Sequence, residues 1–427
     1  MKLWDKGSTP DKQMDLFTVG NDRELDQILV EYDLKASRAH AEMLGKIGIL
    51  DPGETRAIVT ELDKMMEEAR AGDFAIEQPF EDMHSKIEYE LTARIGEAGK
   101  KIHTARSRND QILTALQLYL KDTILSFRTQ VKELFEVLLM LAETHKEVLL
   151  PGYTHLQVAM PSSFGLWFSA YAESLVDDTY FLQTAFRVAD QNPLGSAAGY
   201  GSSFPVDRHF TTSRMGFATQ KFNVVAAQMG RGKVERATAM AMASIAGTLG
   251  KMAMDICLYL SQNFAFISFP EELTTGSSIM PHKKNPDLFE LVRAKCNLVQ
   301  GLPNQLTLLT TNLTSGYHRD LQLTKALLLP AVEQLKACLE ITTSSLGKIK
   351  VNTSILEDPK YDYLFSVDSL DAMVQEGIPF REAYRKIADM IASGVFKPDK
   401  SVRHTHQGSL GNLCLEEIRN KMEQAWN

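Results

Sequence analysis

The feature that most constrains the fold of this chain is a long segment without proline, between Pro79 and Pro151. Proline interrupts helix interiors, so its absence permits one very long helix. Within the segment, apolar side chains recur in steps of three and four, which places them in one stripe along a helix. The stripe predicts a helix over about 111–145. Its members are Leu113, Leu116, Leu120, Ile124, Phe127, Val131, Leu134, Leu138 and Leu141.

Further long helices are expected downstream, because proline is also absent between Pro205 and Pro270. Strand signals are almost absent. Helices this long cannot bury their apolar stripes in a small monomer, and they usually pack as a bundle, often against copies of themselves. We therefore expect an all-α protein that forms an oligomer. The expected helices follow Pro161 to about 190, cover 233–262, start at Pro286, and cover 321–345.

Three helical domains follow from this pattern. The 427 residues are too many for one hydrophobic core. We expect an N-terminal helical domain over 1–110, a central long-helix bundle over 111–350, and a small C-terminal helical domain over 351–427. Helices of the first domain are expected near 22–49, 53–72 and 80–97.

Composition and charge exclude several classes of protein. Apolar residues make up 44% and charged residues 23%, which are ordinary globular values. The net charge of −8 disfavours a nucleic-acid partner. We find no apolar stretch of about 18 residues, so we expect no membrane span. Four scattered cysteines and a polar start, Met1–Lys6, indicate a reducing compartment and a cytoplasmic location.

The usual motifs of nucleotide hydrolysis, zinc proteolysis and α/β-hydrolase chemistry are missing. What remains are polar segments between the predicted helices. They cover 103–111, 151–157, 274–290 and 317–325.

The first polar segment begins the longest helix. Ser107, Asn109 or Asp110 could cap that helix. Arg106 and Arg108 are cations at the positive end of a helix, which costs stability unless an anion is present. Arginine forks and free backbone N–H groups suit a carboxylate. A charged helix start without a ligand is the plain alternative.

In the second segment, Pro151-Gly152 predicts the start of a turn. Thr154 and His155 follow, and a hydroxyl beside an imidazole could bind a carboxylate, although a lone histidine in a turn is more often structural.

In the third segment, Asn285 is expected to cap a helix that starts at Pro286. The loop before it is rich in serine, lysine and amide groups, which suits a dianion, and a solvated loop is the alternative. The fourth segment, taken alone, is an exposed helix start.

The third segment decides between these interpretations. Gly276-Ser-Ser-Ile-Met-Pro-His-Lys-Lys-Asn285 resembles the signature Gly-Ser-Ser-x-Met-Pro-x-Lys-x-Asn of the fumarase/aspartase superfamily. Within that superfamily, the chain looks like the argininosuccinate lyase family, from Leu3-Trp4 to beyond Arg381. The segments that carry this resemblance are 103–111, 151–157, 280–287, Asp320-Leu-Gln322 with Lys325, and Pro379–Ala383.

This resemblance implies a function. The family cleaves argininosuccinate reversibly into arginine and fumarate by an anti β-elimination, the last step of arginine biosynthesis, which also serves the urea cycle. It needs no metal and no organic cofactor. Its members are homotetramers around a central helical bundle, and each active site is built from three subunits.

The resemblance also assigns residues. The carbanion of the elimination is very basic, so the site must supply preorganised cations and donors. Ser277 is the candidate base, activated by Lys283 and loop N–H groups. His155, oriented by Glu290, is the candidate acid, and which of Ser277 and His155 takes the proton is open. The implied substrate-binding residues are Lys283, Asn285 and Thr154 for the succinyl end, Ser37, Asn109, Tyr317, Gln322 and Lys325 for the rest, and Ser107 and Arg108 in the same shell.

Two departures from the family stand out. Ala105 occupies a position that is usually glycine, and Gly230-Arg-Gly232 stands where Asp-Arg-Asp is usual. Alternative functions are another fumarate-releasing lyase such as adenylosuccinate lyase, a crystallin-like protein without activity, and a helical scaffold. The Ser107–Asp110 and Asp320–Gln322 segments argue against the first. The presence of His155 and Ser277 argues against the second, and the serine–lysine loop would have no purpose in the third.

Overall fold

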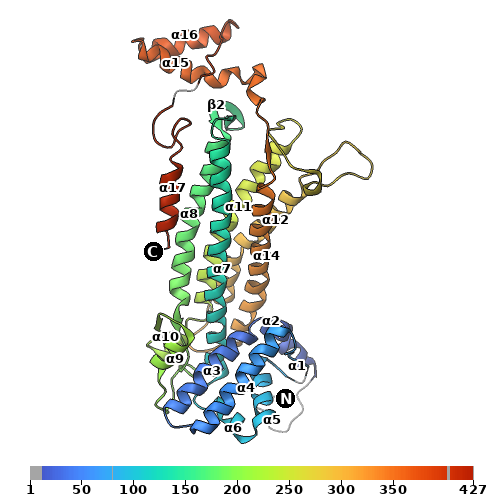
Figure 1. Ribbon diagram of the computed structural model, residues 1–427, viewed down its shortest axis with the longest axis vertical. Coiled ribbons are helices and arrows are strands. Elements are labelled where there is room, and N and C mark those ends of the chain that lie inside the picture. Colours follow the sequence, from blue (N-terminus) through green and yellow to red (C-terminus); the bar gives the residue numbers. More distant parts are fainter. Residues whose placement is uncertain (1–11, 79, 402–403, 427) are drawn as a thin grey trace. The chain divides into compact units, whose positions relative to one another are not determined.

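The computed structural model describes residues 12–78, 80–401 and 404–426 (Figure 1). Leu3-Trp4 and Met1–Lys6 lie outside the described residues. The chain divides into two compact units, each built from three segments. The first unit comprises 1–127, 181–244 and 298–335, and the second comprises 128–180, 245–297 and 336–427. All five boundaries of this division fall inside helices. The division into domains 1–110, 111–350 and 351–427 stays a prediction.

Helices dominate the described chain, which confirms the all-α prediction. The long helices begin and end close to the predicted positions, and every member of the stripe on the longest helix is buried. They are α7 (Arg108–Thr144), α8 (Phe164–Ala189), α11 (Lys233–Leu260), α12 (Asp287–Gln300) and α14 (Leu323–Leu346).

Parts of these helices run side by side in the second unit (Figure 1). Polar bonds join α8 to α11 there. The carboxylate of Asp255 accepts hydrogen bonds from the hydroxyl of Tyr171 (2.6 Å) and the indole N–H of Trp167 (3.1 Å). The hydroxyl of Thr248 donates to Asp178 (2.7 Å). These polar groups of α8 and α11 are therefore paired across the interface between the two helices.

The first unit contains the N-terminal helices. The predicted helix over 22–49 is interrupted at Ile28 and Leu29, whose N–H groups bond the carbonyls three residues back. Asp51 caps the next helix in a capping box with Glu54. These helices are α1 (Lys12–Val19), α2 (Asp22–Gln27), α3 (Val30–Lys46), α4 (Pro52–Ala71), α5 (Met83–Ile95) and α6 (Glu97–Lys100).

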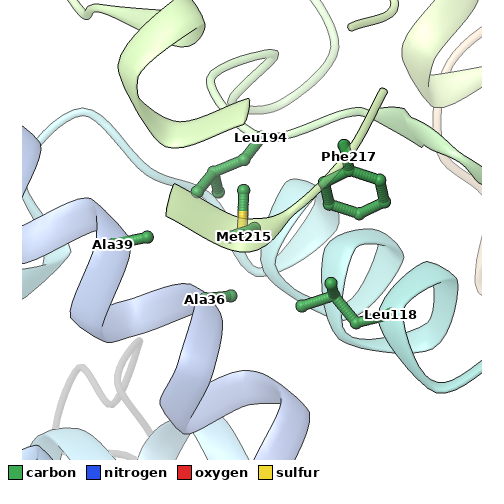
Figure 2. Packing of buried hydrophobic residues seen from close by; sticks show 6 residues of the cluster. All are labelled: Ala36, Ala39, Leu118, Leu194, Met215 and Phe217. Carbon is green, nitrogen blue, oxygen red and sulfur yellow. The ribbon is translucent and has the colours of Figure 1, made fainter. Parts of the chain in front are cut away.

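A buried cluster holds α3 against the start of α7 and the segment after α8 (Figure 2). Small side chains on α3 let the larger ones approach its backbone. The same segment forms α9 (Arg208–Met215) and leads into α10 (Val224–Gln228). The cluster consists of Ala36, Ala39, Leu118, Leu194, Met215 and Phe217.

The few strands are short, and one hairpin corrects a prediction. Pro151 and Gly152 lie inside β1 (Leu149–Thr154), which pairs antiparallel with β2 (Gln157–Ser163), so they do not start a turn. A Cβ at Gly152 would come 2.6 Å from the carbonyl oxygen of Met160, so close backbone approach explains this glycine. The other strands are β3 (Gln191–Asn192) with β4 (Thr219–Gln220), and β5 (Ile267–Ser268) with β6 (Lys350–Val351).

Near the end of the chain, α16 (Phe380–Ala392) packs on α15 (Ser366–Gln375) through Leu370, Ala383 and Ile387. The remaining helices are α13 (Leu302–Leu309) and α17 (Leu415–Gln424).

One described helix, α11, is long and apolar enough to cross a membrane by length and composition alone. Half of its most apolar stretch is already buried inside the protein. That burial is the pattern of a core helix.

Candidate active site

A cavity of about 190 Å³ in the first unit brings together five of the residues predicted to bind substrate. They are Arg108, Asn109, Tyr317, Gln322 and Lys325. Arg108 and Asn109 lie at the start of α7, and Lys325 lies in the first turn of α14. Gln322 belongs to the short 3₁₀ turn Arg319–Gln322 before α14, and Tyr317 comes just before that turn. The cavity is also lined by Asp22, Asp26, Glu81, Asp82, His84, Ile112, Arg231 and Arg319.

The start of α7 is capped as predicted. The Ser107 hydroxyl accepts the N–H of Asn109 (3.3 Å), and the N–H of Ser107 donates to the carboxylate of Asp110 (2.9 Å). Asp110 is buried and also accepts the N–H groups of Gly195 (3.0 Å) and Ala197 (2.9 Å). Burial raises the pKa of the Asp110 carboxyl to about 6, although three backbone donors oppose this shift. The carboxylate thus ties the 195–197 loop to the helix that carries Asn109.

The two arginines at this helix start already have protein partners. The Arg108 guanidinium bonds the carboxylates of Asp82 and Glu81. Arg106 is buried and donates to the hydroxyl of Ser37 (2.8 Å), and burial lowers the pKa of Arg106. The expected anion is therefore supplied, for Arg108, by the protein itself. Neither Ser37, which is fully buried, nor Ser107 lines the cavity.

The charges that line the cavity are closely matched. Lys325 is almost fully buried and pairs with Asp22 (2.7 Å) and with Asp26. Arg319 pairs with Glu81 (3.1 Å). Acidic and basic side chains both line the wall, so the cavity suits a small zwitterion whose charges exchange with these internal pairs.

His84 belongs to this cavity, and we did not predict that role. Nδ1 of His84 bonds the carboxylate of Asp33 (2.9 Å). Its Nε2 is buried without a hydrogen-bond partner. Burial favours the neutral ring, but the charge and hydrogen bond of Asp33 outweigh it and raise the pKa of His84. In the sequence, His84 follows the acidic pair Glu81-Asp82 after one residue, Met83.

In the second unit, Thr154 and His155 stand at the exposed tip of the β1–β2 hairpin. The two central residues of the turn, His155 and Leu156, have φ of +53° and +59°. Two left-handed residues in a two-residue loop are the pattern of a type I′ turn, which favours asparagine and glycine. Strain of this kind persists where the surroundings hold it, often at functional sites.

Residues 274–286, which precede α12, form the serine loop. A bridge between Thr275 and Asn285 closes this loop. The hydroxyl of Ser277 accepts hydrogen bonds from the N–H groups of Met280 (3.1 Å) and Ile279 (3.4 Å). The predicted cap by Asn285 is not formed, because its amide donates to the carbonyl of Gly276 (3.3 Å) and to the hydroxyl of Thr275 (3.4 Å). Helix α12 accordingly begins at Asp287.

The remaining predicted catalytic residues are exposed. Lys283 lies in the serine loop and Glu290 on α12. Within the described part of a single chain, His155 and Glu290 form no hydrogen bond, so the orienting role of Glu290 stays a prediction. No three His, Cys, Asp or Glu side chains converge in a metal-binding arrangement within the described ranges.

Comparisons with known proteins place the chain in a family. A family model described as Lyase matches residues 7–301. An argininosuccinate lyase of Phocaeicola vulgatus is 54% identical over 423 residues, which cover 99% of this chain and 95% of that protein. An argininosuccinate lyase of Thermotoga neapolitana is 40% identical, with 91% of this chain and 98% of that protein covered.

Solved structures share the fold. EDDS lyase in complex with formate aligns with a TM-score of 0.77 and 21% identity over 98% of this chain and 90% of that one. A class II fumarase from Schistosoma mansoni aligns with a TM-score of 0.73 and 17% identity over 96% and 95%. At these identities the structures show the all-α fold alone. The near-full-length relatives and the family model go further: the chain belongs to the argininosuccinate lyase family of lyases.

Proposed function

We propose that this lyase cleaves argininosuccinate reversibly into L-arginine and fumarate by anti β-elimination, as the last step of arginine biosynthesis. The observation that carries the proposal is the cavity of the first unit, where five residues assigned to substrate binding meet. Its carboxylates suit the guanidinium and ammonium groups of the substrate. Its arginines and Lys325 suit the substrate carboxylates.

The elimination removes a proton from the carbon next to a carboxylate of the succinyl end. The electron pair left behind forms the double bond of fumarate as the C–N bond to the guanidinium nitrogen breaks. Ser277 and His155 serve as the two proton-transfer groups, one as acceptor and one as donor. A serine acts as a base only if its alkoxide is stabilised, and the two N–H groups that bond its oxygen supply part of that stabilisation. Lys283 supplies positive charge in the same loop.

The assembly and location are part of the proposal. We infer a cytoplasmic homotetramer around the long helices, with each active site shared by three subunits. It would need no metal or organic cofactor, no nucleic acid and no membrane. Large apolar side chains exposed on the long helices support the association, since contact between subunits would remove them from water. They include Phe181, Met240, Leu291 and Leu298.

The test is fumarate release, followed by ultraviolet absorbance, from argininosuccinate and in parallel from adenylosuccinate. We expect fumarate from argininosuccinate alone, and a loss of roughly 10²–10⁴-fold in turnover for His155→Asn. His406→Asn is the matched control, because His406 is equally exposed and lies outside both the hairpin and the serine loop. Fumarate from adenylosuccinate, or normal turnover by His155→Asn, would contradict the proposal.

A further inference from the structure

A second cavity of the first unit, about 200 Å³ in volume, has no part in the proposed elimination. Its wall is formed by the start of α11 and by the chain between α13 and Gly316. Three cations line it, namely Arg231, Lys233 and Arg236, together with the hydroxyl of Ser315. Among the described residues that line it there is no aspartate or glutamate.

Only one of these cations is neutralised. Nε of Arg231 donates to the buried carboxylate of Glu235 (2.9 Å). That carboxylate also accepts the N–H of Gly232 (2.7 Å) and the hydroxyl of Thr324 (3.2 Å), so its acceptor positions are taken. The side chains of Lys233 and Arg236 form no hydrogen bond or ion pair within the part of the chain that the structure describes.

The two unpaired cations reinforce one another. Lys233 and Arg236 are three residues apart on α11, which places them on one face of the helix, where like charges repel. A third cation is close, because burial and then the charge of Lys233 lower the pKa of Lys221. Concentrated positive charge costs stability unless an anion compensates it.

Side chains, rather than the helix end, would hold such an anion. The N–H of Gly232 already donates to Glu235, and those of Lys233 and Val234 donate to the carbonyl of Gly230 (3.1 Å). A forked guanidinium, an ammonium and a hydroxyl together match the several oxygens of a phosphate group. The volume lies below the roughly 300–1,000 Å³ of sites for drug-sized ligands, so the occupant is a single small group.

We propose that this cavity binds a phosphate group through Lys233, Arg236 and Ser315. The group is either free phosphate or the end of a phosphorylated small molecule. The site adjoins the substrate cavity, since Arg231 lines both. It does not depend on the proposed elimination, because its occupancy is measured without substrate.

The experiment is calorimetric titration of the purified oligomer with inorganic phosphate, glycerol 3-phosphate and succinate at constant ionic strength. We expect one phosphate group per chain, bound at least roughly tenfold more weakly by the double variant Lys233→Gln/Arg236→Gln. Lys35→Gln is the matched control, because Lys35 is an exposed helix lysine of the same unit outside this cavity. The affinity of this variant for phosphate should equal that of the wild type.

Tighter binding of inorganic phosphate identifies the free ion as the ligand, and tighter binding of glycerol 3-phosphate identifies a phosphorylated molecule. Absence of binding, an unchanged affinity in the double variant, or equal affinity for succinate would overturn the proposal. If the double variant does not fold, Ser315→Ala decides instead. Its affinity should fall severalfold, because one hydrogen bond to the anion is lost, and an unchanged affinity would overturn the site.

Discussion

At the scale of single residues, the Asp33–His84 pair makes stability depend on pH. The raised pKa of His84 means that the folded protein holds this proton more tightly than the unfolded chain, whose histidine titrates near 6.5. The stabilisation is complete below that pH and is lost as pH rises through the folded-state pKa, with a slope of at most about 1.4 kcal/mol per pH unit for one proton. We expect the thermal midpoint to fall as pH rises above 6.5, and His84→Gln to flatten that fall.

His40 provides the matched comparison. Burial, and then the charge of Arg106, lower the pKa of His40 well below its usual value. The unfolded chain therefore binds this proton more tightly, and stability falls as pH drops below 6.5. His84→Gln should leave that acidic side unchanged. An equal slope above pH 6.5 in wild type and variant would show that the pair does not carry the dependence.

Single residues were also the level at which sequence patterns predicted least. Ala105, where the family usually has glycine, has φ of +63°, a backbone conformation that an L-residue adopts only at a cost. Ser37 is fully buried and accepts a hydrogen bond from Arg106, and its assignment to the substrate stays a prediction. The contact between Ser37 and Arg106 joins residues far apart in the chain, which neither periodicity nor spacing encodes.

At the scale of elements, the β1–β2 hairpin is strained at its tip. Leu156 has a left-handed backbone conformation, which costs free energy for a residue with a Cβ. In the single chain, 79% of Leu156 is exposed. Leu156→Gly should raise the free energy of unfolding by about 0.5–1 kcal/mol, because glycine removes the penalty of about 1–2 kcal/mol and returns part of it as unfolded-state entropy. Denaturant unfolding measures the difference. Leu156→Ala is the control, since it keeps a Cβ, and a glycine variant less stable than the alanine variant would contradict the strain.

The helices were predictable from sequence and the hairpin was not. The stripe from Leu113 to Leu141 predicted α7 because burial along one helix face is a local, periodic signal. The helix predicted over 321–345 is present as α14, although Pro330 lies inside that helix. The hairpin was missed because Pro151 and Gly152 resemble a turn in sequence, and the close approach of Met160 that requires Gly152 is visible only in three dimensions.

At the scale of the whole molecule, all predicted site residues except Ser37 and Ser107 fall into two groups. Arg108, Asn109, Tyr317, Gln322 and Lys325 meet in one cavity of the first unit. Thr154, His155, Ser277, Lys283, Asn285 and Glu290 belong to the second unit. The resemblance supplied both groups, because its motifs are contiguous in sequence. It could not say which members meet within one chain, since that depends on packing and on assembly.

Sharing of active sites between subunits can be tested with two variants that each lack one catalytic group. His155 and Lys283 are both exposed, so His155→Asn and Lys283→Ala should leave the fold intact while removing activity. If a site takes these residues from different subunits, random mixed oligomers place both intact residues in about a quarter of the sites. Co-expression of the two variants with different affinity tags, followed by tandem purification, should therefore restore about a quarter of wild-type turnover.

The control for this restoration is the oligomer of each variant alone, purified in the same way, which should stay inactive. Chains that each carry both substitutions form a second control, since no mixture of them contains an intact site. If His155 and Lys283 act from the same subunit, every chain of a mixed oligomer lacks one of them. The mixture would then be as inactive as its parents, and sharing of the active site between these two residues would be wrong.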